Sequence, residues 1–188
     1  MMYVKKLILI TLLATGLLQS ETSIGIDINN EDVEILGELN FNSLADYSSG
    51  TTYILDISYL YTDGDHLAAV GFSGQNTLQG AEGLTLAFGA KLAFAEDFMA
   101  LPLMAKAIYA LPFNDSIPTT SLVASFAYAP SVLTFLDGET YSELRLEADM
   151  EVISNIHIFT GYRNIDTDYE TGDYNFNDSF YAGMKLSF

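Results

Sequence analysis

Hydrophobic and polar residues alternate along most of the chain with a period of two. Between Leu84 and Phe94, Leu, Phe and Ala take the even positions, and Thr, Ala, Gly and Lys take the odd ones. Successive side chains of a strand point to opposite faces, so the pattern predicts β-strands. We expect at most one helical turn, at Pro130–Leu136. Ten segments qualify as strands: Ile24–Asn29, Asp32–Phe41, Thr52–Thr62, Leu67–Gly74, Leu84–Phe94, Ala100–Leu111, Ser121–Tyr128, Ser142–Val152, Asn155–Asn164 and Ser179–Phe188.

Turn-rich segments separate these strands, which favours hairpin connections and an antiparallel meander. The strands approach the ~9–11 residues that a tilted membrane-spanning strand needs. We therefore predict an all-β fold, a closed antiparallel up-and-down transmembrane β-barrel. Bacterial single-chain barrels have even strand counts from about 8 upward, so the expected number is 8 to 10. The turn at Ser154–Asn155 is then periplasmic, and Asp166–Asp178 forms an extracellular loop.

The first twenty residues differ from the rest of the chain. Lys5 and Lys6 precede an apolar run from Leu7 to Leu18, the layout of a cleaved secretory signal peptide. Cleavage is expected after Ser20, with Gly16 as a second candidate. A membrane anchor is the alternative, but the run is shorter than the ~20 residues of a spanning helix. Residues 21–188 then form a single barrel domain.

The charge is strongly acidic. The 188 residues include 7 Lys+Arg and 25 Asp+Glu. Because residues 1–20 hold two of those bases and no acid, the remainder carries five bases against 25 acids, a net charge of −20. Such a chain lacks the basic clusters that bind nucleic acid. It has no Cys, which excludes disulfides, thiolate metal sites and Cys nucleophiles.

The charges also indicate which face of the sheet is which. A soluble barrel would place apolar side chains inside, whereas a membrane barrel places them outside. All five bases lie on the polar faces of expected strands, and none lies in the turns. We therefore predict a lumen filled by paired charges, with Gly89, Gly161 and Gly183 leaving room for long side chains. The expected network comprises Lys91, Lys106, Glu143, Arg145, Glu147, Asp149, Glu151, His157, Arg163 and Lys185.

The C-terminus carries a further signal. The chain ends in an alternating strand with a terminal aromatic residue, Phe188. This ending resembles the signal that the outer-membrane barrel insertion machinery recognises. The 12 Tyr and 12 Phe are typical of the aromatic girdles of membrane barrels.

Three segments resemble the YfaZ family of bacterial outer-membrane proteins: GAEGLTLAFGAKLAF (Gly80–Phe94), ALPLMAKAIYALP (Ala100–Pro112) and YAPSVLTFLDGETYSELRLEADMEVISNIHIFTGYRNI (Tyr128–Ile165). The resemblance covers most of the chain after residue 20 and is best from Gly80 onward. It implies an outer-membrane β-barrel of a Gram-negative bacterium. It implies no reaction.

The sequence offers little for catalysis. Its two histidines are His66, in an expected turn, and His157, in the expected lumen. No G-x-S-x-G motif is present. A lipid-active enzyme is the weaker alternative. We expect no catalytic residue and no cofactor.

An acidic stretch in the expected extracellular loop is the candidate for weak cation binding: Asp166, Asp168, Glu170 and Asp173. It lacks the twelfth-position Glu of an EF-hand, where Asn177 stands. A solvated acidic loop, or one that meets lipopolysaccharide through divalent cations, is the competing interpretation.

These patterns favour an outer-membrane protein, expected to be a monomer, with a structural or interaction role. The partners expected are the lipid bilayer, lipopolysaccharide and the insertion machinery, and not nucleic acid. A small, passive, cation-preferring pore is the main alternative, although narrow barrels are usually filled by side chains.

Overall fold

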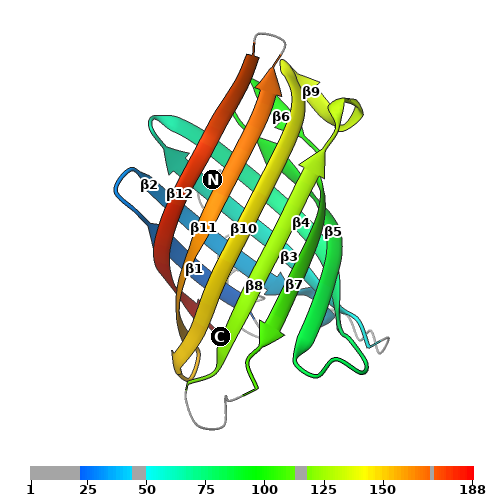
Figure 1. Cartoon of the computed structure of the whole chain (residues 1–188), viewed down its shortest axis with the longest axis vertical. Coiled ribbons are helices and arrows are strands. Elements are labelled where there is room, and N and C mark those ends of the chain that lie inside the picture. The colour runs from blue at the N-terminus through cyan, green and yellow to red at the C-terminus, as the bar shows by residue number, and fades with distance from the viewer. Residues whose placement is uncertain (1–21, 44–49, 113–117, 170–171) are drawn as a thin grey trace, which may run out of the picture.

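The fold is a closed, antiparallel, ten-stranded β-barrel (Figure 1). The computed structural model describes residues 22–43, 50–112, 118–169 and 172–188. The expected signal peptide lies outside these residues. The ten barrel strands are β1 (Thr22–Ile28), β2 (Asp32–Asn40), β3 (Thr52–Thr62), β4 (Asp65–Thr77), β5 (Leu84–Phe94), β7 (Leu103–Ala110), β8 (Thr120–Ala129), β10 (Gly138–Ile153), β11 (Ile156–Tyr169) and β12 (Gly172–Ser187).

Each strand pairs with its neighbour in the chain, and pairing of β1 with β12 closes the ring. The strand count is thus the upper end of the predicted range, and the all-β barrel is confirmed. Four short elements complete the fold: β6 (Phe98–Ala100), β9 (Thr134–Leu136) and the 3-10 turns η1 (Phe41–Ser43) and η2 (Ser131–Leu133). No helix in the described ranges is long and apolar enough to cross a membrane.

The barrel has two distinct ends. At one end the Phe188 N–H donates to the Thr22 carbonyl at 2.8 Å, which ties the last strand to the first. We call this the terminus end. The opposite end, the distal end, carries β6, η2 and β9, and there β10, β11 and β12 reach beyond the other strands (Figure 1, top).

The predicted extracellular loop Asp166–Asp178 is wrong as a loop. Most of it lies in β11 and β12, which pair as far as Tyr169 and Gly172. A β-bulge between Ile165 and Asp166 gives β12 one extra residue. The strands here extend beyond the band of exposed apolar side chains that surrounds the barrel. Their outward positions, such as Asp166 and Asp168, are polar, so the alternation of apolar residues stops. Backbone pairing continues nonetheless.

The predicted strand Ala100–Leu111 is also divided. β6 ends at Ala100 and β7 begins at Leu103. Between them lies Pro102, which has no N–H to donate to the ladder, although its carbonyl still accepts from the Lys91 N–H at 3.0 Å. Beyond the break, β6 still pairs with β5 on one edge and pairs with β9 on the other.

The outer face is apolar. Among the most exposed side chains on the barrel strands are Phe180 (77%), Phe88 (64%) and Leu103 (62%). They belong to the faces that the alternation assigned to lipid. Apolar side chains outside and charged ones inside are the arrangement of a membrane barrel, not of a soluble one.

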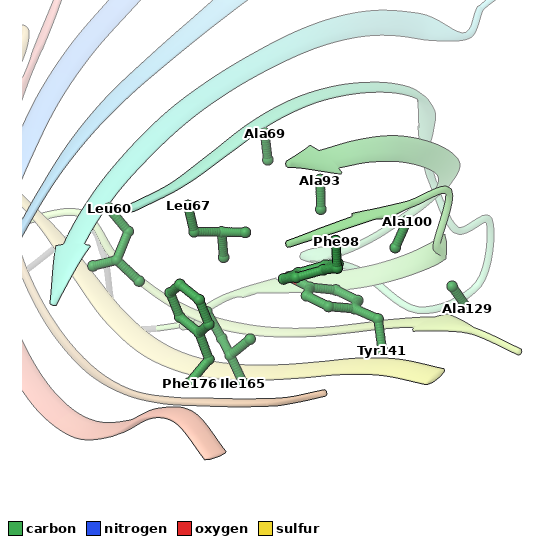
Figure 2. Packing of buried hydrophobic residues seen from close by; sticks show 10 residues of the cluster. All are labelled: Leu60, Leu67, Ala69, Ala93, Phe98, Ala100, Ala129, Tyr141, Ile165 and Phe176. Atoms are coloured by element: carbon green, nitrogen blue, oxygen red, sulfur yellow. The ribbon is translucent and has the colours of Figure 1, made fainter. Parts of the chain in front are cut away.

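An apolar layer fills the distal end of the interior (Figure 2). Phe98 of β6 is fully buried there and lies 5.8 Å from Tyr141 and 6.4 Å from Phe176, measured between ring centroids. The short β6–β9 ribbon thus carries an aromatic side chain into the barrel. The other buried members are Leu60, Leu67, Ala69, Ala93, Ala100, Ala129 and Ile165.

Candidate functional site in the barrel lumen

The centre of the lumen is organised around Arg163 of β11, whose side chain is fully buried. Its Nη1 donates to Glu34 Oε2 at 2.5 Å and its Nε donates to Asn177 Oδ1 at 2.9 Å. Asp27 and Asp32 lie 3.4 and 3.5 Å away. The guanidinium also lies over the ring of Tyr181, 5.2 Å from its centroid, a cation–π arrangement.

Arg145 of β10 extends this cluster across the barrel. Its Nη1 and Nη2 donate to the two oxygens of Glu34, each at 2.7 Å. Its Nε donates to Glu143 Oε1 at 2.7 Å. The Tyr141 hydroxyl donates to Glu143 Oε2 at 2.5 Å, and Lys91 pairs with the same oxygen. Charge-assisted bonds of this kind are about twice as strong as neutral ones, so they hold β2, β5 and β10 together from inside.

A second, looser cluster lies toward the terminus end. Glu38 of β2 lies 3.5 Å from Lys106 and 3.7 Å from Lys185. Lys185 also lies 3.5 Å from Asp149, which is hydrogen-bonded to His157 Nδ1 at 2.7 Å. These side chains are partly exposed, up to 32% for Glu38. Solvent therefore enters the lumen from the terminus end.

The structure brings nearly all of the sequence-predicted lumen residues together. Glu147 joins the group through the Tyr181 hydroxyl, which donates to it at 3.1 Å. Glu151 is the exception. It lies beside the β10–β11 turn, where it accepts a hydrogen bond from the Asn155 N–H at 3.1 Å, because β10 ends two residues later.

Sequence reasoning missed the acidic partners from the first three strands. Asp27, Asp32, Glu34, Glu38 and Asp56 all face the lumen and supply carboxylates opposite the bases. The signal was present, since Asp32, Glu34 and Glu38 are spaced by multiples of two within one strand. That spacing places them on a single face.

The lumen is closed where the charged and apolar layers meet. Interior side chains from nine of the ten barrel strands are at most 4% exposed: Asp27, Glu34, Leu60, Ala69, Ala93, Ala129, Tyr141, Arg163, Ile165 and Tyr181. Tyr141 joins the two layers, with its ring among the apolar side chains and its hydroxyl on Glu143. Side chains that line an open aqueous channel would be accessible to water, and these are not.

The glycines predicted to leave room for long side chains in the lumen instead leave room for aromatic rings and for backbone. Gly161 faces Tyr181 across the β11–β12 pair, and Gly183 faces Phe159. A Cβ at Gly183 would lie 2.5 Å from Phe159 Cζ, and one at Gly161 would lie 2.7 Å from Tyr181 Cζ. At Gly89 the close neighbour is the backbone of β4. The space is taken by aromatic rings and backbone, not by long charged side chains.

The expected cation-binding residues are dispersed over the distal hairpin. Asp166 accepts a hydrogen bond from Asn175 at 2.7 Å, and Asp168 accepts one from Thr140. Asp173 lines a separate cavity, and Glu170 lies outside the described residues. In the described part of the chain, no group of three or more His, Asp and Glu side chains could hold a metal ion.

The distal cavity has a volume of about 840 Å³, and its described lining includes His66 but no Lys or Arg. Its carboxylates are Asp65, Glu96, Asp97, Asp137 and Asp173. Tyr174 lies beside them, and its hydrogen bond to Asp65 raises the pKa of the Tyr174 hydroxyl to about 12. His66, expected in a turn, lies in β4, where its Nδ1 is hydrogen-bonded to the Tyr59 hydroxyl at 2.6 Å. This end of the molecule is therefore strongly acidic.

Solved structures offer distant likenesses. One is titled "Bacterial polysaccharide outer membrane secretin", with 12% identity, a TM-score of 0.46, and coverage of 88% of this chain and 68% of that chain. Another, titled "Unveiling the Mechanism Behind the in-meso Crystallization of Membrane Proteins", has 10% identity, a TM-score of 0.44, and coverage of 89% and 83%. Likenesses this weak bear on neither ligand nor activity. No curated protein matches the chain. The family model described as YfaZ precursor matches residues 9–188, nearly the whole chain, which therefore belongs to the YfaZ family.

Proposed function

We propose that the protein is a non-conducting barrel of the bacterial outer membrane with a structural or interaction role. The observation that carries this proposal is the closed lumen, where Arg163 and Tyr141 have no solvent exposure. Family membership and the apolar outer face support the location. The short turn at Ser154–Asn155 is expected in the periplasm. The terminus end, which carries this turn, then faces the periplasm, and the distal end faces the outside. A barrel that conducts nothing interacts with its surroundings through its two ends and its outer wall.

Planar-bilayer recording of the refolded protein tests the closed lumen. We expect no steady current steps above those of protein-free bilayers, because both layers of the interior exclude water. The passive pore is the alternative function. Steady, cation-selective steps would support it and would overturn the non-conducting role.

We further propose that the distal end contacts lipopolysaccharide through divalent cations. Its outward side chains include Asp166 and Asp168, and its cavity adds five carboxylates. Lipopolysaccharide phosphates and these carboxylates repel one another unless a cation lies between them. Calcium titration by calorimetry, with and without lipopolysaccharide in the micelles, tests the contact. Because calcium also binds lipopolysaccharide alone, the heat of protein-free micelles is subtracted, and no additional heat with the protein would refute the contact.

A lipid-active enzyme remains the second alternative. His157 is the one lumen histidine, and its Nδ1 is bonded to Asp149 within the ion-pair cluster. We assign it to that cluster and not to a catalytic step. Lipase, acyltransferase and peptidase assays on the protein and on His157→Ala distinguish the roles, since activity that disappears in the variant would establish an enzyme.

A further inference from the structure

Backbone pairing leaves one long strand edge open at the distal end. Of the 16 residues of β12, the last six, Ala182–Ser187, pair with β1. The other ten, Gly172–Tyr181, have β11 as their one strand neighbour in the described residues, because β1 ends at Ile28, opposite Ala182. Figure 1 shows this part of β12 rising above the β1–β2 hairpin. Alternate N–H and C=O groups of such a segment point away from β11 and lack a ladder partner.

Side chains cross the gap that the backbone leaves. Asn177 Nδ2 and Ser179 Oγ each donate to Asp32 Oδ2 at 2.8 Å. The Tyr174 hydroxyl donates to Asp65 at 2.6 Å. In the described residues, no backbone hydrogen bond joins this segment to an element other than β11. The inner face of the segment is therefore held in place while its backbone edge stays unpaired.

The open edge extends beyond the apolar band of the outer wall. Phe180 is 77% exposed on the lipid-facing wall, and the next outward residues, Asp178, Asn175 and Asp173, are exposed and polar. The β11 partners of these three are spaced by two, so the three share one outer face in spite of the bulge at Phe176. Unpaired backbone groups are costly in hydrocarbon, but this part of the edge lies outside the band and can pair with another chain.

The charges beside the edge determine which chain fits it. Asp173 lies directly opposite Asp168 of β11, and like charges in such a position destabilise a sheet. Neither Asp173 nor Asp178 has a basic group within 4.0 Å in the described residues. A strand on the open side of β12 would place its outward side chains beside these two acids, where Lys or Arg is favourable. A second copy of the protein would bring the same acids to the contact, so it fits poorly.

We propose that an extended segment of a partner protein, bearing Lys or Arg at alternate positions, adds to the open edge as a further strand beside Gly172–Asp178. In this mode of binding, backbone hydrogen bonds supply affinity and alternate side chains supply specificity. The unpaired edge provides the first, and Asp173 with Asp178 provides the second. Such a contact is one form of the interaction role proposed above and rests on it. It does not rest on the closed lumen, which the bilayer recordings test separately.

Calorimetric titration of the refolded protein in micelles with a synthetic peptide of alternating Lys and Thr, about eight residues long, tests the proposal. We expect saturable binding. Hydrogen exchange followed by mass spectrometry should slow in Gly172–Asp178 when the peptide is bound, because amides of the edge gain partners. The same peptide with every backbone nitrogen methylated keeps its charges but has no N–H to donate, and it should not bind.

Two double variants test the charges. Asp173→Asn with Asp178→Asn removes two acids beside the edge and should weaken binding severalfold. Glu96→Gln with Asp97→Asn removes two exposed acids from the β5–β6 turn at the same end, and this matched control should bind like the parent. The heat-dependent shift in gel mobility reports whether each variant forms its barrel.

The proposal is overturned if the peptide gives no saturable binding, if the methylated peptide binds equally well, or if both double variants bind alike. Protection of the same amides in a dimer, without peptide, would assign the edge to a second copy and would also overturn it.

Discussion

Arg145 and Glu34 form a bidentate ion pair across the lumen, with the Nη1–Oε2 and Nη2–Oε1 distances both 2.7 Å. They are 111 residues apart in the chain and join β10 to β2. The same carboxylate also receives Arg163. One acid therefore contacts two guanidinium groups, and it comes from a strand that does not neighbour either β10 or β11.

Glu34→Gln should strongly destabilise the barrel. Glu34 is fully buried, and the amide would leave two buried cations short of one counter-charge. Breaking a buried pair from one side costs about 3–5 kcal/mol. The protein has no Trp, so far-UV circular dichroism is used to follow urea unfolding in lipid vesicles and to measure the loss of stability. Glu31→Gln, an exposed acid three residues earlier in the chain, should leave the midpoint unchanged, and equal midpoints for both variants would contradict the role of Glu34.

Phe98→Ala should destabilise the distal end without opening the lumen. The ring is fully buried among Tyr141, Tyr169 and Phe176, and Phe→Ala in a core costs about 3–5 kcal/mol. The Arg163 layer beneath it stays intact, so bilayer recordings should still show no steady current. Phe180→Ala, on the lipid-facing wall, should cost less. Steady conductance in Phe98→Ala would show that the apolar layer alone closes the barrel.

The wall of the barrel is predictable from sequence because lipid imposes a simple rule on alternate positions. Ile24, Ile26 and Ile28 all point outward, as the alternation requires. The rule fails above the bilayer, where outward residues such as Asp166 become polar while the strands continue. A hydrophobic pattern therefore cannot predict how far the strands extend beyond the membrane.

The lumen is predictable only in part. Period two identifies which residues face inward, and all five bases could be placed there. Their partners depend on strand register and on ring closure, so the pairing of Arg145 with Glu34 has no local signal. The aromatic rings over Gly161 and Gly183 likewise follow from the β11–β12 register.

Gly183→Ala should destabilise the β11–β12 pair. The added methyl group would lie 2.4 Å from the Ile26 carbonyl oxygen and 2.5 Å from Phe159, and overpacking typically costs about 1–3 kcal/mol. Gly37→Ala is the matched control, since its nearest neighbour would be 3.9 Å away. Unfolding midpoints in vesicles compare the two. The close packing over Gly183 is refuted if both variants unfold at the parental urea concentration.

Phe188→Ala should impair insertion in the cell but not folding in the test tube. The side chain is 54% exposed on the outer wall, and the terminal residue is held by a backbone bond from its N–H to Thr22 that alanine retains. Refolding yield in detergent should therefore match that of the parent. We expect the insertion machinery, by contrast, to recognise the aromatic ring, so the amount of folded protein in isolated outer membranes should fall severalfold. Phe180→Ala, another exposed aromatic residue of β12, controls for loss of ring area. An equal loss in both variants would assign the effect to lipid contact instead of a terminal signal.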